Sequence, residues 1–462
     1  MRSRVGWVTI RSMKGVSTMC EHDHSTGPVP TAKLERRHVL AGAAALAGLG
    51  LAGMVPGIAQ GAEPPGRSAA AHRPSTVKSA PVIVEGGSLI DPATGQLIED
   101  AVVVLAGGIV QSVGTRDENR KAVAKYAASA TRINAHGKFI LPGFVDAHVH
   151  AQAFEDAALI LSHGATTVRS GSSSFYQDIA LARVPDFAPG LAPRMHAAGL
   201  FVSPDQSDSI LADPDLAPLA ALRHQITDPK DLAYLTGVNI ARGATVIKTR
   251  ANPRAGLAEQ DPLELVYGRE QLAAIVKAAK GAGVLCHSYS AEGIAGAVAA
   301  GVKSIEHGVF MDEKTMVRMA KQGTYFTPTL YGIAGMANSS DPVLSERGRE
   351  YGPVLAEAAR AANELGVTVI GGTDSFGTDV TPIGAEAKAL SDAGLGKLKA
   401  LQSITTAPAK LLGVDHRGVG RLVRHGVADL VLLGSNPLES AAALSDVHTV
   451  VAQGSIVRGE AA

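Results

Sequence analysis

The chain is short of cysteine and carries no excess of either charge. Cys20 and Cys286 are its only cysteines, which excludes Cys-x-x-Cys metal sites and leaves histidine and carboxylate as the expected metal ligands. Lysine plus arginine and aspartate plus glutamate number 43 each. Because such a chain has no basic field to attract phosphate groups, we predict a small-molecule substrate and no nucleic-acid partner.

The first 80 residues carry a targeting pattern. Arg36 and Arg37 precede an uncharged run rich in alanine and glycine, 41–62, that ends in small residues. This order is typical of a secretory signal, and the arginine pair resembles a twin-arginine signal. We therefore expect an exported protein (periplasmic, cell-surface or secreted) without stable membrane association after processing. An uncleaved membrane anchor is the alternative, and translation begins at Met1 or Met19.

Short β-like runs stand at both ends of the mature chain. Residues 82–84, 101–105 and 109–113 form one such group, separated by turn-forming residues, and 428–433 and 448–457 form another. Two β-segments at opposite ends of a chain often pair into one domain, which leaves the middle as an insertion. We assign 81–141 and 416–462 to the two parts of a small composite domain.

The middle, 142–415, alternates strand-like and helix-like segments. This alternation is the signature of βαβ units and predicts a (β/α)8 TIM-like barrel. A doubly wound open sheet is the competing α/β fold, but no Gly-x-Gly-x-x-Gly turn follows the first strand. Helices are expected over residues 269–280, 291–300, 312–322 and 353–365. Strands are expected over residues 143–147, 165–169, 194–199, 244–248, 284–287, 304–306, 324–329 and 367–373.

Ionisable residues follow several of these predicted strands. Barrel enzymes place their working residues at the carboxyl ends of strands. The period-2 alternation of a strand points both imidazoles of a His-x-His pair the same way. Taken singly, a buried histidine is more often an ordinary core residue, and an aspartate after a strand can be a simple turn or helix cap. Together they predict a metal site, formed by His148, His150, Lys248, His287, His307 and Asp374.

The motifs around these residues resemble those of a known family. Residues 141–150, LPGFVDAHVH, are similar to the opening signature of the amidohydrolase superfamily. Segments around Lys248, His287, His307 and Asp374 follow in that family's order. The resemblance is closest to the imidazolonepropionase-like and prolidase-like branch. It implies a barrel attached to a β-sandwich that is split between the two ends of the chain.

The resemblance also implies a binuclear metal centre. His148, His150 and Asp374 would hold one divalent ion, and His287 and His307 a second. Imidazole and carboxylate ligands suit Zn²⁺, with Mn²⁺, Co²⁺ and Fe²⁺ as alternatives.

Lys248 would bridge the two ions as a carbamate formed with CO2. An ammonium group buried in a strand is costly, whereas a carbamate replaces that cation with an anionic bridge. Asp374 would be the catalytic acid and base, taking a proton from the attacking water and passing it to the leaving nitrogen.

Three further residues are candidate substrate contacts. Arg250, two residues after Lys248, would bind a substrate carboxylate in fork geometry, and a solvent-facing loop arginine is the alternative. Tyr289 would donate to an oxyanion or only wall the pocket. Arg169 ends the second strand, but Ser170 follows it where the family often has aspartate. This departure leaves the substrate contacts near Arg169 open.

We expect hydrolysis of an amide or peptide-like C–N bond in a dipeptide, an N-acyl amino acid or a cyclic amide. Lactonase or phosphotriesterase-like activity would use a similar site. Deamination is disfavoured because Ser290 stands where one-metal relatives carry glutamate. A non-catalytic binding protein is disfavoured because no ligand is missing. A homo-oligomeric state stays open.

Overall fold

The computed structural model describes residues 79–459. The arginine pair and the Ala/Gly-rich run of the predicted export signal lie outside this range. Within it, no helix is both long and apolar enough to cross a membrane.

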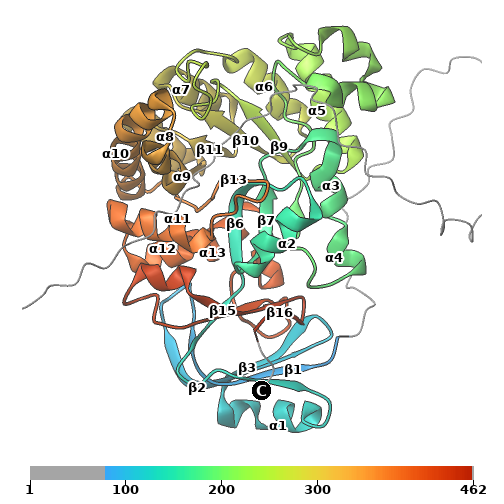
Figure 1. The fold of residues 1–462 in the computed structure, drawn as a ribbon, viewed down its shortest axis with the longest axis vertical. Helices are drawn as coiled ribbons and strands as arrows, with labels where there is room; N and C mark the ends of the chain where they lie inside the picture. Colours follow the sequence, from blue (N-terminus) through green and yellow to red (C-terminus); the bar gives the residue numbers. More distant parts are fainter. Residues whose placement is uncertain (1–78, 460–462) are drawn as a thin grey trace, which may run out of the picture. The chain divides into compact units, whose positions relative to one another are not determined.

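Strands from both ends of the chain form one sheet of eight strands, in the order β16-β15-β14-β5-β1-β2-β3, with β4 paired to β1. Figure 1 shows the blue N-terminal and red C-terminal strands side by side. The junction is the antiparallel pair of β5 and β14, in which Ile140 faces Leu432. Val103 and Leu432 belong to the apolar cluster on this sheet. The strands are β1 (Val82–Ile90), β2 (Leu97–Ala106), β3 (Ile109–Thr115), β4 (Thr131–Asn134), β5 (Phe139–Pro142), β14 (Leu430–Leu433), β15 (Val447–Ala452) and β16 (Ser455–Arg458).

The expected pairing of the two chain ends is thus present as a shared sheet. A single helix, α1 (Arg116–Tyr126), follows β3 and begins with a capping box between Thr115 and Glu118. The sandwich form and the limits assigned to the composite domain stay predictions.

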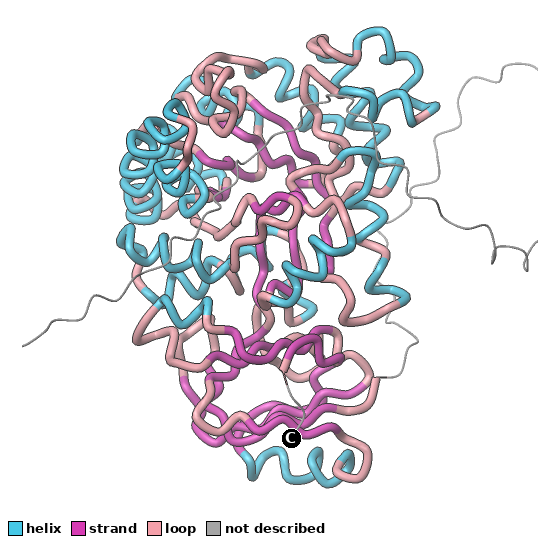
Figure 2. Tube along the Cα trace, in the orientation of Figure 1, coloured by secondary structure: helices cyan, strands magenta, loops and turns pink. Residues whose placement is uncertain are grey.

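The middle of the chain is an α/β unit of the TIM-barrel type, with parallel strands inside and helices outside (Figure 2). Its strands form two four-stranded sheets, β13-β6-β7-β8 and β12-β11-β10-β9, instead of one closed sheet. At one seam Val202 bridges Thr249, and at the other Phe326 bridges Val369. The strands are β6 (Phe144–His150), β7 (Ala165–Ser170), β8 (Arg194–His196), β9 (Val246–Arg250), β10 (Gly283–Ser288), β11 (Ser304–His307), β12 (Tyr325–Thr327) and β13 (Ser375–Phe376).

The predicted eighth strand, 367–373, is not a regular strand. Its backbone bonds alternately to both neighbours, since the amide of Ile370 donates to Phe326 and the amide of Ala147 donates to Gly371. A Cβ at Gly372 would lie 2.7 Å from the Cβ of His148. The segment is therefore pressed against β6 at a glycine, and only the short β13 beyond it pairs in register with β6.

The helices on the outside match most of the predicted ones. The exception is the helix expected over 353–365, which begins instead at Pro342, after the side chain of Asp341 caps its first turn. Pro353, the first residue of the expected range, lies inside it. The helices are α2 (Phe154–Ser162), α3 (Gln177–Leu181), α4 (Val184–Phe187), α5 (Pro229–Arg242), α6 (Arg269–Ala278), α7 (Ala291–Ala300), α8 (Glu313–Gln322), α9 (Leu330–Gly335), α10 (Pro342–Glu364), α11 (Ile383–Leu390), α12 (Lys397–Ser403) and α13 (Thr406–Leu411).

Alternation along β9 and β10 decides which side chains enter the barrel. Ile247 and Cys286 pack in the large apolar cluster shared with the outer helices. Val246 and Leu285 form a separate small cluster with Ala198. Successive side chains of a strand point to opposite faces, so Lys248 and Arg250 share the face of Val246, away from the helices.

Candidate metal centre

Three of the predicted ligands converge at the ends of β6 and β13. His148 and His150 end β6 on the same face, and Asp374 directly precedes β13. The Asp374 Oδ1 atom lies 3.4 Å from His148 Nε2 and 3.2 Å from His150 Nε2. One ligand atom from each residue lies within 4.8 Å of the others. Such a cluster suits a divalent ion held by two imidazoles and a carboxylate.

His287 and His307 stand beside this cluster. The ring centroids of His287 and His307 are 4.5 Å apart, and those of His148 and His307 are 5.5 Å apart. The ring of Tyr289 is stacked on His307 with centroids 5.1 Å apart. The four histidines, from β6, β10 and β11, thus gather at one end of the barrel strands.

Each of the four imidazoles has one nitrogen anchored by a protein group outside the cluster, while the Nε2 atoms of His148 and His150 lie next to Asp374. Protein groups that anchor the far nitrogen of a metal-binding histidine fix its tautomer and its ring orientation. A carbonyl or carboxylate partner can only accept, so the imidazole nitrogen donates. The pairs are His148 Nδ1 with Glu306 (2.8 Å), His150 Nδ1 with Ser172 O (3.2 Å), His287 Nε2 with Pro253 O (2.9 Å) and His307 Nδ1 with Thr329 Oγ1 (2.8 Å).

The protonation states suit metal binding. Burial lowers the pKa of His148 to about 4 and that of His307 to about 3, so both rings are neutral near pH 7. Burial alone would raise the pKa of Asp374, but His148 and the hydrogen bond from His150 outweigh it and hold that pKa well below its ordinary value. Neutral imidazoles and an ionised carboxylate are the forms that bind cations.

Lys248 lies inside the same cluster. Its side chain is 1% exposed, and its Nζ atom is 2.8 Å from His148 Nε2. Burial lowers the pKa of Lys248 to about 8, which leaves a larger share of neutral amine than an ordinary lysine has. A free amine is the form that reacts with CO2, so the position and the pKa of Lys248 both suit a carbamate.

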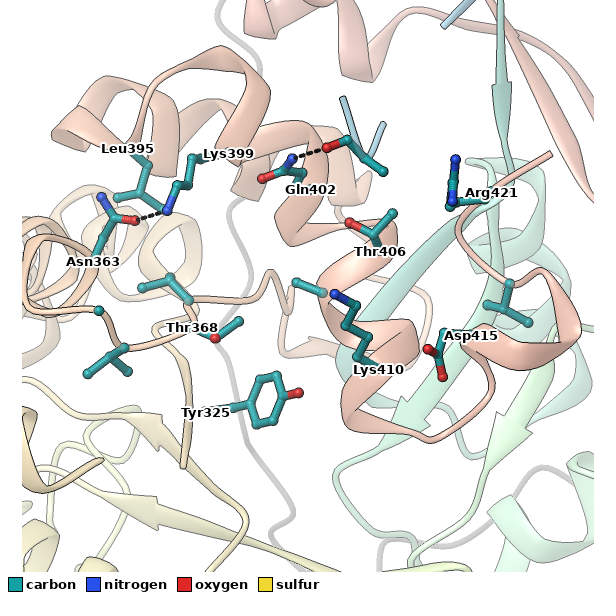
Figure 3. Close-up of a pocket in the computed structure, with 16 residues that line it drawn as sticks. Tyr325, Asn363, Thr368, Leu395, Lys399, Gln402, Thr406, Lys410, Asp415 and Arg421 are labelled. Atoms are coloured by element: carbon teal, nitrogen blue, oxygen red, sulfur yellow. Dashed lines mark hydrogen bonds between the residues drawn. The ribbon is translucent and has the colours of Figure 1, made fainter. Parts of the chain in front are cut away.

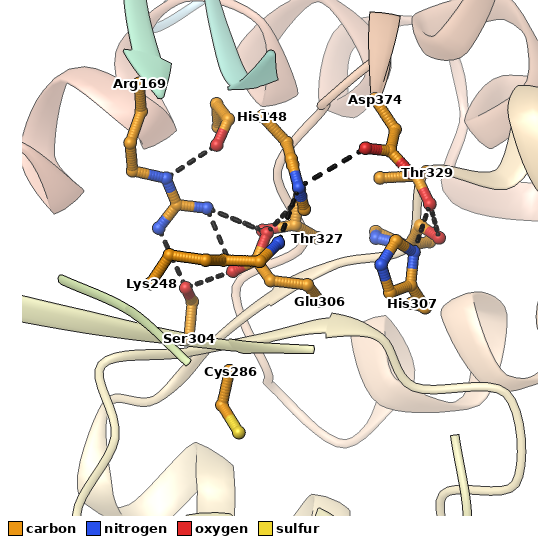
Figure 4. A network of polar contacts seen from close by, with 12 residues as sticks. His148, Arg169, Lys248, Cys286, Ser304, Glu306, His307, Thr327, Thr329 and Asp374 are labelled. Carbon is orange, nitrogen blue, oxygen red and sulfur yellow. Dashed lines mark hydrogen bonds and ion pairs between the residues drawn. The ribbon is translucent and has the colours of Figure 1, made fainter. Parts of the chain in front are cut away.

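Arg169 has a different environment from the one predicted. It is 2% exposed, and its guanidinium donates to both carboxylate oxygens of Glu306 at 3.0 Å, to Ala147 O at 2.6 Å and to Ser304 Oγ at 2.8 Å. Figure 4 shows this network, with Glu306 between Arg169 and His148. The geometry does not support a substrate contact for Arg169. Instead, Arg169 holds the carboxylate that orients His148.

Sequence reasoning missed Glu306 although the residue lies directly before His307. It is fully buried, and although burial opposes ionisation, Arg169 and the bond from His148 hold the pKa of Glu306 below its ordinary value. A buried carboxylate within a strand was the available signal, because an unpaired one is too costly to bury.

Arg250 and Tyr289 lie next to the histidines. Arg250 is opposite His287 in the register of β9 and β10, is 8% exposed, and its guanidinium carbon lies 4.4 Å from the ring centroid of Phe201. Tyr289 also has an edge-on ring contact with His287, with centroids 4.9 Å apart. Both positions are compatible with the predicted substrate contacts.

With this geometry established, the comparisons with known proteins give the family. The model of the amidohydrolase family matches residues 139–457. The chain belongs to the amidohydrolase family.

Several known proteins are similar to this amidohydrolase over most of its length. The chain is 24% identical over 408 residues to ochratoxinase of Aspergillus niger, which covers 79% of this chain and 83% of that protein. The structure of a Xaa-Pro dipeptidase with bound methionine is 25% identical, with a TM-score of 0.68, and covers 82% of this chain and all of the other. A prolidase complexed with N-methylphosphonate-L-proline is 25% identical, with a TM-score of 0.66 and the same coverage. The prolidase-like branch predicted from the motifs is confirmed.

A cavity of about 470 Å³ lies elsewhere in this amidohydrolase (Figure 3). It is lined by Tyr325, at the start of β12, and by Lys399 and Lys410 of α12 and α13. The histidines instead stand at the opposite, carboxyl ends of the strands, where barrel enzymes place their chemistry. We therefore assign no part of the reaction to this cavity.

Proposed function

We propose that the protein is a binuclear metal-dependent amidohydrolase that cleaves the amide bond of a small substrate carrying a carboxylate. Membership of the family supports a hydrolase that acts on amide or peptide bonds. The observation that carries the finer proposal is the convergence of four oriented imidazoles, an ionised aspartate and a buried lysine at one end of the barrel strands.

His148, His150 and Asp374 would hold one divalent ion, and His287 and His307 the other. Zn²⁺ suits this ligand set, and Mn²⁺, Co²⁺ or Fe²⁺ are alternatives. Two such ions supply a hydroxide at neutral pH and polarise the scissile carbonyl.

The chain's own groups handle the proton. Asp374 is ionised and lies within 3.4 Å of both histidines of β6, so its free oxygen can accept a proton from the nucleophile and return it to the leaving nitrogen. Glu306 and Arg169 keep the ring of His148 in place during this transfer. Transfer to nitrogen matters because an amine leaves readily and an amide anion does not.

Lys248 would bridge the two ions after reaction of its neutral amine with CO2. The nitrogen lone pair forms a bond to the carbon of CO2, the electrons of one C=O π bond move onto its oxygen, and the proton lost from nitrogen passes to solvent water. The product is a carbamate with two oxygens able to bind metal. Its place beside His148 supports this role. Lys248→Ala is expected to lose one metal equivalent and the activity. Lys303→Ala, at an exposed lysine before β11, is the matched control.

Arg250 would bind the substrate carboxylate. A guanidinium that is 8% exposed and lies next to His287 can form two parallel bonds to a carboxylate close to the reacting amide. The Xaa-Pro dipeptidase and prolidase structures support a substrate of the dipeptide or N-acyl amino acid class. Lactones and phosphotriesters remain the second class, since a hydroxide in such a site also attacks esters. We propose as well that the mature enzyme acts outside the cytoplasm.

The test is a screen of the purified mature protein with measured metal content. Zn²⁺ and bicarbonate are added, and dipeptides, N-acyl amino acids, their carboxamide analogues and lactones are compared by kcat/KM. We expect two metal equivalents and a preference for amides with a free carboxylate. A protein with near-zero bound metal and no gain on reconstitution would contradict the enzyme assignment. A preference for lactones would contradict the substrate class.

A further inference from the structure

The hydrogen bonds of Thr329 favour one tautomer of His307. The Thr329 hydroxyl donates its single proton to Pro328 O at 2.7 Å, so toward His307 Nδ1, 2.8 Å away, the same oxygen can only accept. Nδ1 of His307 therefore carries the hydrogen, and the lone pair of Nε2 is left for a ligand. Figure 4 shows Thr329 beside His307.

The backbone at Thr329 is strained. Its φ is 53° and its ψ is 39°, in the left-handed region, which β-branched residues occupy only as outliers. Thr329 is fully buried, so solvent cannot relieve the strain by bonding the backbone. Residues in such conformations persist only where the surrounding structure holds them.

Glu386 provides that support from another element. It lies on α11, is fully buried, and accepts the backbone amides of Leu330 at 3.0 Å and Tyr331 at 2.7 Å. These are the first two amides of α9, which directly follow Thr329 and have no partner within their own helix. In the described part of the chain, the carboxyl group of Glu386 has these two amides as its hydrogen-bond partners.

Burying the carboxyl group of Glu386 costs free energy, so a structural role for it is expected. Burial raises the pKa of Glu386 to about 8, which shows that its environment disfavours the charge. A six-residue helix such as α9 can be capped by an exposed serine or aspartate at far lower cost. A carboxyl group reaching from α11 instead fixes the α9 start to the barrel.

We propose that Glu386 is a positioning residue for His307. By holding the amides of Leu330 and Tyr331, it keeps Thr329 in the left-handed conformation that presents its hydroxyl to His307 Nδ1. This keeps Nε2 of His307 free for the second metal ion. The role of Glu386 in metal binding therefore rests on the proposed function.

The experiment compares Glu386→Ala with Lys388→Ala. Lys388 lies on the same helix and forms an exposed ion pair with Asp392, so its variant controls for changes to α11. Metal content is followed by mass spectrometry as the holoenzyme is dialysed against graded chelator. In Glu386→Ala we expect the second ion to bind 10- to 100-fold more weakly, the size of effect typical of lost outer hydrogen bonds. The first ion and the Lys388→Ala protein should be unchanged.

Thr329 variants test whether Glu386 acts through that residue. Thr329→Ser keeps the hydroxyl and should keep the second ion, whereas Thr329→Ala should lose affinity for it as Glu386→Ala does. The double variant Glu386→Ala/Thr329→Ala should be no weaker than Thr329→Ala alone, because two residues in one chain of contacts are not additive. Additive losses would overturn the proposal, since they would mean that Glu386 only stabilises the fold.

A second readout is independent of metal. Nitrogen NMR of the histidine-labelled protein, stripped of metal, reports the tautomer of His307, with His307→Asn to assign its signals. We expect Nδ1–H in the wild type and a mixture in Glu386→Ala. Unchanged tautomer and unchanged second-ion affinity in Glu386→Ala would overturn the proposal.

Two further outcomes are distinguished. If Glu386→Ala does not fold, Glu386→Gln is measured instead. Its amide keeps one of the two acceptor oxygens, so we expect a smaller loss of affinity for the second ion. If the wild type binds only one ion, the binuclear function fails, and the tautomer alone decides the role of Glu386.

Discussion

Replacing Arg169 with methionine would test the network that orients His148. The guanidinium is 2% exposed and its bonds reach Glu306, Ala147, Ser304 and Thr327. Removing one partner of a buried ion pair leaves the other charge uncompensated, which typically costs roughly 3–5 kcal/mol of folding free energy. We expect a loss of this size, because Glu306 itself is fully buried.

The same substitution should weaken metal binding. Once Arg169 is lost, Glu306 no longer has a fixed position from which to accept the Nδ1 hydrogen of His148, and metal affinity should fall by about 10- to 100-fold. Arg169→Met/Glu306→Gln should be more stable than Arg169→Met, since the amide carries no buried charge yet can still accept from His148.

Urea unfolding and metal analysis would measure both effects. Arg360→Met is the matched control, because Arg360 forms only exposed ion pairs with Glu357 and Glu364 and surface pairs contribute little. A substrate contact at Arg169 would instead raise KM and leave stability and metal content intact. That result would refute the structural role.

Two other predictions concern the site. Arg250→Met should raise KM at least tenfold for substrates with a free carboxylate and leave KM for their carboxamides unchanged; equal changes for both would contradict a carboxylate contact. Burial lowers the pKa of His148 to about 4 and that of His307 to about 3 in the folded chain, so the unfolded chain binds more protons below pH 6.5. Stability of the metal-free protein should therefore fall between pH 6.5 and about pH 4, with a shallower slope in His148→Gln; identical slopes in urea titrations would contradict the assignment.

The sequence was informative wherever a residue's role depends on its place in a repeating pattern. His150 and His307 are the last residues of β6 and β11, and His148 and Lys248 lie two residues before the ends of β6 and β9. Apolar runs precede these residues in the sequence, and parallel strands of a barrel bring their carboxyl ends together. Strand periodicity failed at residues 367–373, where the backbone bonds alternately to two neighbours.

Some helix boundaries follow from local sequence signals and others do not. Gly301 and Gly323 end α7 and α8 in the left-handed conformation, which a glycine directly after a helical run favours. The start of α10 was misplaced because Pro353 is tolerated inside a long helix that Asp341 caps twelve residues upstream of it.

By itself, the sequence determined the order of the elements, the family motifs and the residues able to bind a metal. Only the tertiary structure decided what holds those residues in place. Arg169 and Glu306 are 137 residues apart, and Glu386 and Leu330 are 56 apart. A local sequence pattern predicts which face of a strand or helix a side chain occupies. Its hydrogen bonds depend instead on which distant groups folding brings within about 3 Å of that side chain. That physical difference turned Arg169 from a predicted substrate contact into a support for His148.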